Sequence, residues 1–211
     1  MMLSRQANIV DITRNKDYES FLYKCLAPMP FRKYKSRLEY LELAVPRGFH
    51  KKLLVFGAEV VGQIEYAPCE VSGYPVTGEE IIVMNCIWVL RKAKGHNFGK
   101  KLVEDMMQSE KNASGFATIA LENHWSPWFR KWQMEKLGFK SIDDVKVAHK
   151  TKHQGQVFSI HLMWMPKEKY AEQPAWDKEK ILYGERFCLA HPLYNPLWKE
   201  KILEVTLEVS S

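Results

Sequence analysis

The sequence predicts one α/β (α+β) domain over residues 1–165 and a C-terminal extension over residues 166–211. Short apolar or alternating runs, typical of strands, recur between segments with helical spacing. A chain of 211 residues with 46% hydrophobic and 12% aromatic residues supplies a sizeable core. This size suits one domain plus an appendage better than two full domains. Beyond Pro166 the pattern changes to charged stretches and Pro/Asn-type breakers, which predicts the extension.

The N-terminal segment predicts one strand followed by two helices. Residues 7–13 alternate like a strand, and residues 17–26 and 32–45 carry helical patterns. Pro28 and Pro30 stiffen the connection between the two helices.

A strand pair follows these helices. Residues 52–56 and 59–66 flank the tight turn at 57–58 and predict two antiparallel strands. Residues 67–78 are rich in Pro, Gly and Ser and predict a loop that leads to the next strand.

A glycine-bearing turn then joins a buried strand to an amphipathic helix. Residues 80–89 are strand-like, and the turn at 94–99 opens the helix. The turn and the first helical residues expose backbone N–H groups at the positive end of the helix dipole, so they predict a phosphate-binding loop. The face expected to pack carries Phe98, Leu102, Val103, Met106 and Met107, and the face expected to be solvated carries Lys100, Lys101, Glu104 and Asp105.

The remaining elements complete the sheet. Residues 116–122 predict another buried strand, and Ser126 followed by Pro127 is a typical start for a helix that runs to Leu137. A last hairpin follows this helix.

That hairpin and the tail contribute the final strands. Residues 139–147 and 156–165 predict the hairpin, and residues 202–209 alternate like one more strand. The tail either extends the sheet or mediates a homodimer, and the sequence leaves both alternatives open.

Composition limits the partners and the compartment. A net charge of +6 and a pI near 9.0 suit an anionic ligand, nucleic acid or an anionic membrane surface. The basic residues are scattered among acids, which favours a local anion site over a nucleic-acid track. The four cysteines form no CxxC pair and no N-terminal signal peptide is present, so we expect a cytoplasmic protein. No run approaches the roughly 18 apolar residues of a membrane span.

Two spacings are similar to metal sites, at Cys188 and His191 and at His149 and His153. Neither has a second pair at ligand spacing, so we expect no metal.

The phosphate-binding segment resembles the acyl-CoA-binding motif of the GNAT N-acetyltransferase superfamily. That motif reads Arg/Gln-x-x-Gly-x-Gly/Ala and falls here on Lys94, Asn97 and Gly99. Lysine keeps a cation for the pyrophosphate, and asparagine tolerates left-handed backbone geometry. Further on, Met134 and Gly138-Phe139 match the family's Tyr-x-x-x-Gly-Phe, with methionine in place of tyrosine. The Cys-Ile-Trp-Val strand also resembles the YoaP-like branch.

This resemblance implies a GNAT fold, with a mixed, splayed central sheet flanked by helices. It implies that acetyl-CoA binds at the splay and that the primary amine of an unidentified acceptor attacks the thioester directly in a ternary complex. The residues expected to bind acetyl-CoA are Ile87, Trp88, Val89, Lys94, Gly95, His96, Asn97, Phe98, Gly99, Lys100 and Asn123.

The catalytic groups follow less directly from the motif. Glu80, Glu122 and His124 lie at strand ends where they could accept a proton, and we name them as candidate bases. Met134 stands where the family's general acid tyrosine is expected, and it cannot donate a proton. An acyl-CoA-binding sensor with a GNAT fold is therefore an alternative to a transferase. A nucleic-acid-binding module is a second, weaker alternative.

Overall fold

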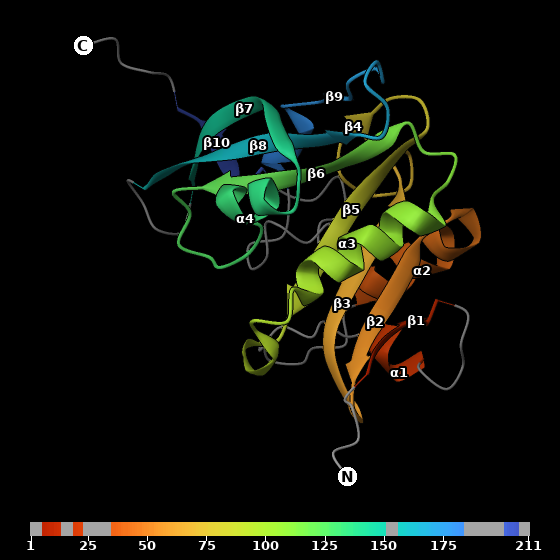
Figure 1. The fold of residues 1–211 in the computed structure, drawn as a ribbon. Coiled ribbons are helices and arrows are strands. Elements are labelled where there is room, and N and C mark those ends of the chain that lie inside the picture. The colour runs from red at the N-terminus through yellow and green to blue at the C-terminus, as the bar shows by residue number, and fades with distance from the viewer. Residues whose placement is uncertain (1–5, 14–18, 23–34, 151–155, 184–200, 207–211) are drawn as a thin grey trace.

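An eight-stranded sheet forms the centre of the computed structural model (Figure 1). The structure describes residues 6–13, 19–22, 35–150, 156–183 and 201–206. In sheet order the strands are β1 (Ala7–Asp11), β2 (His50–Phe56), β3 (Glu59–Pro68), β5 (Ile81–Val89), β6 (Gly115–Glu122), β8 (Val157–Pro166), β7 (Lys140–His149) and β10 (Leu203–Val205). A two-stranded sheet pairs β4 (Val76–Thr77) with β9 (Ala175–Trp176). The helices are α1 (Glu19–Leu22), α2 (Lys35–Ala44), α3 (Phe98–Ser109) and α4 (Lys131–Lys136), and the 3₁₀ turns are η2 (Val45–Arg47), η3 (Arg91–Ala93) and η4 (Lys180–Leu182).

The sheet is mixed, and it opens in its middle. β5 and β6 are parallel and pair only where Ile81 to Val83 face Gly115 to Ala117, whereas the other neighbouring strands are antiparallel. On the other edge of β5 the register with β3 shifts at Asn85, which is an extra residue on β5. A bulge of this kind bends and twists its strand. The expected splayed sheet is confirmed, and the bulge lies where the splay starts.

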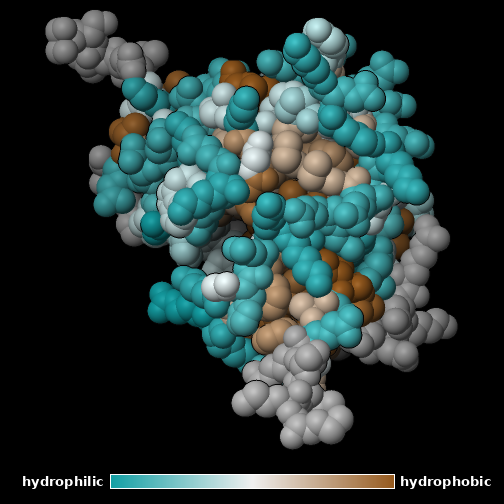
Figure 2. All heavy atoms as spheres, in the orientation of Figure 1, coloured by the Kyte–Doolittle hydropathy of each residue, from teal (hydrophilic) through white to brown (hydrophobic). Residues whose placement is uncertain are grey.

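Helix α3 covers one face of β3 and β5 (Figure 1). Its predicted apolar face is confirmed, because Phe98, Leu102, Val103 and Met106 are buried. Each of these side chains contributes about 1.5–3 kcal/mol through burial. The opposite face forms a hydrophilic band across the centre of Figure 2. One expectation there is corrected, because Asp105 binds the amine of the buried Lys52 at 2.6 Å rather than only solvent.

Helix α2 lies on the opposite face of the sheet from α3 (Figure 1). A smaller cluster of buried side chains joins it to β3 and to the start of β2, and it comprises Leu22, Leu41, Ala44, Phe49, Ala67 and Val71. This cluster is separate from the large one, which contains the buried side chains of α3.

The helix before the last hairpin starts later than its sequence predicts. Ser126 was expected to cap it, but α4 begins at Lys131 with Arg130 as its N-cap residue. Ser126 instead accepts a hydrogen bond from Trp128 N–H at 3.1 Å. The intervening chain pairs with β6, since Leu121 N–H donates to Phe129 O at 2.7 Å. This pairing holds Phe129 and Arg130 outside a helix.

The described part of the C-terminal extension packs onto the main core. Ile181, Leu182, Ile202 and Leu203 are buried in the large hydrophobic cluster. Strand β10 pairs with β7, so the tail extends the sheet. The dimer alternative stays a proposal. Parts of the predicted elements at 17–26, 32–45 and 202–209 lie outside the described residues, as do Pro28, Pro30, His153, Cys188 and His191.

Candidate functional site

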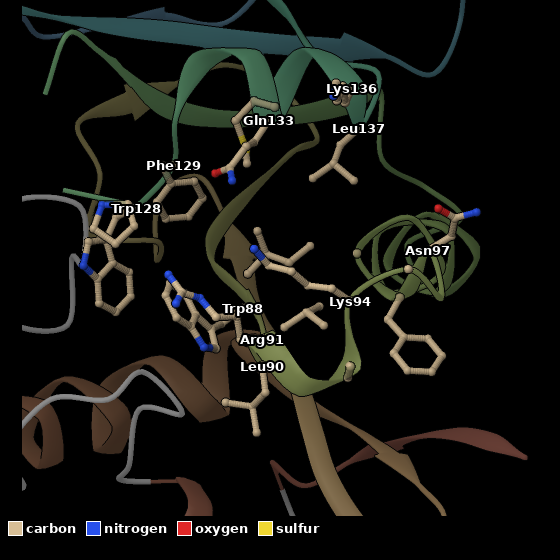
Figure 3. A pocket seen from close by; sticks show the side chains of 18 of the residues that line it. Trp88, Leu90, Arg91, Lys94, Asn97, Trp128, Phe129, Gln133, Lys136 and Leu137 are labelled. Atoms are coloured by element: carbon tan, nitrogen blue, oxygen red, sulfur yellow. The ribbon is translucent and has the colours of Figure 1, made fainter. Parts of the chain in front are cut away.

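A pocket of about 960 Å³ lies at the open end of the splay (Figure 3). Gln133 and Lys136 of α4 and Leu137 just after it line one side, and Lys94 and Asn97 of the loop before α3 line the other. The described residues that line it are Ile87, Trp88, Val89, Leu90, Arg91, Lys92, Ala93, Lys94, Gly95, Asn97, Phe98, Gly99, Pro127, Trp128, Phe129, Trp132, Gln133, Met134, Lys136 and Leu137.

Strand β5 directs backbone groups toward this opening. Leu90 N–H donates to Val61 O of β3 at 2.8 Å, so the amide of Leu90 points toward β3. Backbone groups alternate in direction along a strand, so the N–H and C=O groups of Ile87 and Val89 point toward the gap. The pairing of β5 with β6 ends at Val83, before Ile87 and Val89 are reached. A ligand with amide groups could therefore complete the hydrogen bonding of this strand edge.

The loop between η3 and α3 has the backbone geometry of an anion cradle. Gly95 has φ 89° and Asn97 has φ 55°, both left-handed. Asn97 is the N-cap residue of α3, and within the described structure no side chain caps that helix. The first N–H groups of a twelve-residue helix are thus open to a ligand, together with the positive end of its dipole.

Cations and apolar side chains share the walls of the pocket. Arg91, Lys94 and Lys136 provide positive charge for phosphate groups. The rings of Trp88 and Trp128 contact each other with centroids 4.9 Å apart. These features fit the two parts of an acyl-CoA, which are a polyanionic head and a thin amide-bearing arm.

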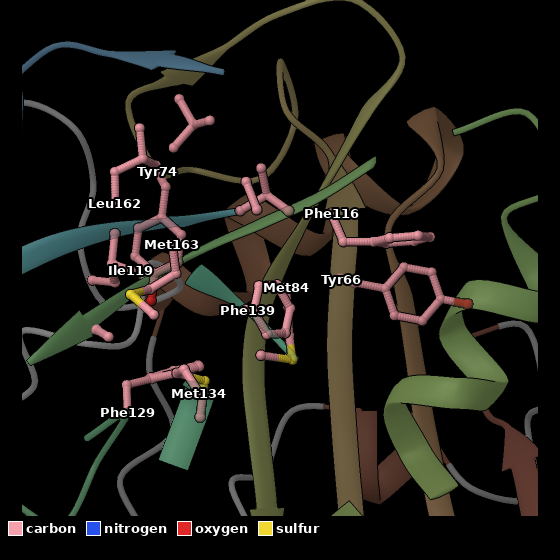
Figure 4. Packing of buried hydrophobic residues seen from close by; sticks show 14 of the residues in the cluster. Tyr66, Tyr74, Met84, Phe116, Ile119, Phe129, Met134, Phe139, Leu162 and Met163 are labelled. Carbon is pink, nitrogen blue, oxygen red and sulfur yellow. The ribbon is translucent and has the colours of Figure 1, made fainter. Parts of the chain in front are cut away.

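The position of the family's acid tyrosine is occupied by a core methionine. Met134 is only 2% exposed and packs beside Phe129 in the large cluster, while it also lines the pocket (Figure 4). Its thioether has no proton to give. Met134 therefore cannot fill the role of the acid that the resemblance implies at this position.

Glu80 lies at the wrong end of β5 for a base. It immediately precedes Ile81, where β5 still pairs with β6, and its side chain is exposed. Six residues of extended strand separate Ile81 from Ile87, which is about 20 Å. Glu80 therefore lies about that far along β5 from the pocket-lining residue Ile87.

Glu122 is held in an ion-paired network. Its carboxylate contacts Lys131 Nζ and His161 Nε2, each at 3.2 Å. The Nδ1 atom of the buried His161 lies 2.9 Å from Ser141 Oγ. Partial desolvation raises the pKa of Glu122, but Lys131 and His161 outweigh it, so the pKa is lowered. A carboxylate with a lowered pKa is a weak base at neutral pH.

Glutamine at position 122 should therefore affect stability rather than catalysis. We expect Glu122→Gln to keep the affinity for acetyl-CoA and kcat within about threefold, since no described contact places this group in the pocket. Because the carboxyl group has a lower pKa in the folded than in the unfolded protein, it stabilises the fold at pH values above the unfolded pKa of about 4.3. This stabilisation is lost as the pH falls through the folded-state pKa. The difference in melting temperature between the two proteins should shrink as pH falls from about 5 to 3, as thermal scans would show.

His124 and Asn123 lie outside the pocket lining. The Nδ1 atom of His124 accepts a hydrogen bond from Ser126 N–H at 3.1 Å. The imidazole packs against Trp125 and Phe158, with ring centroids 3.8 Å and 4.6 Å away. To take a proton at Nδ1, His124 would first have to lose the bond from Ser126. Asn123 is exposed in the same turn, with φ 62°.

Eight of the eleven residues predicted to bind acetyl-CoA line the pocket, and the three that do not are His96, Lys100 and Asn123. His96 stacks on Phe98 with centroids 5.0 Å apart, and Lys100 is exposed. The backbone amides of His96, in the loop, and of Lys100, in the first turn of α3, still belong to the cradle segment.

The wall formed by α4 and the loop before it was not predicted to bind acetyl-CoA. Its contributors are Pro127, Trp128, Phe129, Trp132, Gln133, Met134, Lys136 and Leu137. The four-residue step from Trp128 to Trp132 was a usable signal. It fits the wall of an acceptor pocket as well as a core face, so sequence alone could not decide between them.

Among the described residues, no helix is both long and apolar enough to cross a membrane. No group of three or more His, Cys, Asp or Glu side chains in the described part is placed to hold a metal ion.

Comparison with known proteins identifies relatives by structure alone. The sequence matches no model of a known protein family, and no curated protein is similar to it in sequence. Solved structures do match. A GNAT family acetyltransferase from Elizabethkingia anophelis with acetyl-CoA bound has a TM-score of 0.51 at 15% identity, over 76% of this chain and 97% of that one.

A second solved structure matches this chain to a similar extent. The Bacillus subtilis acetyltransferase in complex with CoA has a TM-score of 0.51 at 16% identity, over 76% of this chain and 99% of its own. Identities this low support the fold and not the chemistry. The chain therefore has the fold of the GNAT acetyltransferases.

Proposed function

We propose that this protein is an acetyl-CoA-dependent N-acetyltransferase that transfers an acetyl group to the primary amine of an acceptor. The observation that carries this proposal is the open edge of β5 beside an uncapped helix N-terminus, within one pocket. Acetyl-CoA, bound by the related folds, supplies an activated acyl group there. An acceptor amine attacks the thioester carbonyl, the C–S bond breaks, and the CoA thiolate leaves and takes up a proton.

The chain contributes mainly binding and orientation. The amides of residues 95–100 and the side chains of Arg91 and Lys94 would hold the phosphates. The backbone N–H groups of Ile87 and Val89 would align the arm, and one of them could polarise the thioester oxygen. Holding the thioester beside a bound amine supplies much of the rate enhancement.

We also propose that no side chain of the predicted set is the general base. Glu80 lies far from the opening, Glu122 is ion-paired with a lowered pKa, and His124 already accepts a hydrogen bond. The acceptor amine would then lose its proton to water, or bind in its neutral form. Water likewise protonates the thiolate, since Met134 cannot.

The pH dependence of the rate tests this proposal. We expect kcat/KM to rise about tenfold per pH unit and to level off near the pKa of the acceptor amine itself. Two acceptors whose amines differ in pKa should give profiles displaced by that difference in a thiol-release assay. Profiles with one shared midpoint would instead indicate a titrating group of the protein.

A second candidate is a sensor that binds acyl-CoA without turning it over. The buried Met134 at the acid position favours it, because rapid transfer usually benefits from protonation of the leaving group. The same pocket would serve either function, so turnover is the property that separates them.

Calorimetric titration with acetyl-CoA, together with a thiol-release assay over a panel of amines, tests the proposal. Binding with amine-dependent release supports the transferase. Binding without release for any amine supports the sensor, and no binding would contradict both. A YoaP-like relationship, a cytoplasmic location, independence from metals and nucleic acid, and homodimer formation are additional proposals that rest on the sequence.

A further inference from the structure

The indole N–H of Trp88 is a buried hydrogen-bond donor that has no acceptor among the described residues. Trp88 lies on β5 between Ile87 and Val89, at the level where β6 has diverged. The residue lines the pocket (Figure 3), although its Nε1 atom is shielded from solvent. Beside the gap between β5 and β6, the protein therefore carries an indole N–H donor that has no acceptor among the described residues.

This placement costs stability in the unliganded protein. A buried donor without an acceptor loses its bonds to water and gains none in exchange. The indole ring itself is well accommodated, since it packs on Trp128 with centroids 4.9 Å apart. Phenylalanine could provide a similar aromatic contact without the polar atom. The packing therefore explains an aromatic residue at this position but does not explain the N–H group.

The rest of the lining indicates which ligand atom could pair with this donor. The described lining residues include no Ser, Thr, Tyr, His, Asp or Glu. Their polar side chains are donors or amides, namely Trp88, Arg91, Lys92, Lys94, Asn97, Trp128, Trp132, Gln133 and Lys136. A ligand that fits this lining must bring acceptors. The acyl-pantetheine arm of an acyl-CoA brings carbonyl oxygens, and the cationic side chains suit its phosphates.

We propose that Trp88 Nε1–H donates a hydrogen bond to a carbonyl oxygen of the acyl-pantetheine arm, and so positions the arm in the gap. This inference rests on the proposed binding of acetyl-CoA. The oxygen belongs either to the thioester or to an amide of the arm, and both have the same acceptor chemistry. The bond would satisfy Trp88 only in the complex, so part of the binding energy comes from relieving an unfavourable state of the free protein.

The variant that tests this inference is Trp88→Phe, titrated calorimetrically with acetyl-CoA and with CoA. We expect about a tenfold loss of affinity, the effect of one buried hydrogen bond. A loss for acetyl-CoA alone assigns the bond to the thioester oxygen, and an equal loss for both ligands assigns it to an amide of the arm. Unchanged affinity for both would overturn the inference.

The matched control is Trp176→Phe. Trp176 lies outside the pocket lining, and its Nε1–H donates to Asp143 at 2.8 Å. This substitution should lower the melting temperature and leave both affinities unchanged. Trp88→Phe should instead leave the melting temperature of the ligand-free protein unchanged or raise it. A clear loss of stability in free Trp88→Phe would mean that the N–H group is structural, against the inference.

A measurement on the unsubstituted protein avoids any folding defect. The chain has seven tryptophans, and ¹⁵N labelling of tryptophan gives one indole N–H resonance for each. Saturation with acetyl-CoA should move the assigned Trp88 resonance downfield. If acetyl-CoA binds but that resonance does not move, the inference fails while the proposed function stands. If acetyl-CoA does not bind at all, the proposed function itself fails.

Discussion

Replacing Gly99 by glutamate should abolish acetyl-CoA binding without unfolding the protein. Gly99 is the second residue of α3 and lines the pocket. A carboxylate there faces the phosphates that the cradle is proposed to hold. Two like charges about 4 Å apart repel by about 4 kcal/mol at an effective dielectric constant of about 20. Even with partial screening, we expect affinity to fall at least about a hundredfold in a calorimetric titration.

The fold should tolerate this change. A Cβ atom at Gly99 would meet the Leu137 side chain at 3.7 Å, which is ordinary van der Waals contact. Position 99 is helical and, unlike Gly95, does not need left-handed geometry. A carboxylate in the first turn of a helix is also favourable for the helix dipole. The thermal transition should therefore remain cooperative and close to that of the unsubstituted protein.

Two variants serve as controls for this experiment. Gln108→Glu adds the same charge to an exposed position near the other end of α3, and it should not change affinity. Gly99→Ala adds a methyl group without charge, and it should weaken binding only a few-fold. A folded Gly99→Glu protein with unchanged affinity would contradict the assignment of this loop to the phosphates.

The loop is also the part of the site that sequence predicted best. Its geometry depends on neighbours along the chain, and the residue types at 95 and 97 are those that tolerate left-handed backbone. The apolar spacing of α3 likewise depends on local period alone. Asn97 in place of the motif's first glycine takes φ 55°, so this departure from the motif preserves the conformation.

The environments of the candidate bases could not be predicted from the sequence, because distant residues build them. Glu122 meets His161, 39 positions away, and this contact is set by the pairing of β6 with β8. The sequence placed a carboxylate at a strand end, but not its contacts with Lys131 and His161, which lower its pKa. The predicted start of α4 was wrong for a related reason. Backbone pairing of Phe129 with β6 overrode the preference of Ser126 for the N-cap position.

The sheet behind the site contains an ion pair whose disruption should strongly lower the stability of the protein. Lys51 Nζ contacts Glu65 Oε1 at 2.8 Å, and both side chains are fully buried. The two residues lie opposite each other on β2 and β3, and Glu65 in turn lies opposite Cys86 of β5. A buried charge depends on its ionic contacts, so removing one member takes this contact from the other while it stays buried.

We expect Lys51→Met to destabilise the protein by about 3–5 kcal/mol. In a chain of this length that corresponds to a fall in melting temperature of roughly 6–20 °C. Adding Glu65→Leu to Lys51→Met should recover most of the loss, because the pair of apolar side chains leaves no buried charge. Denaturant titration of the single and double variants measures the coupling directly.

Lys180→Met is the matched control, since Lys180 pairs with Asp177 at 3.2 Å on the surface. Exposed pairs contribute little because water screens both charges, so its melting temperature should scarcely change. A similar small effect for Lys51→Met would show that Glu65 becomes protonated, or finds other partners, at little cost. A double variant no more stable than Lys51→Met would show that the ion pair itself, rather than an uncompensated charge, stabilises this part of the sheet. Recovery in the double variant would instead show that strands β2, β3 and β5 pack stably without the buried ion pair.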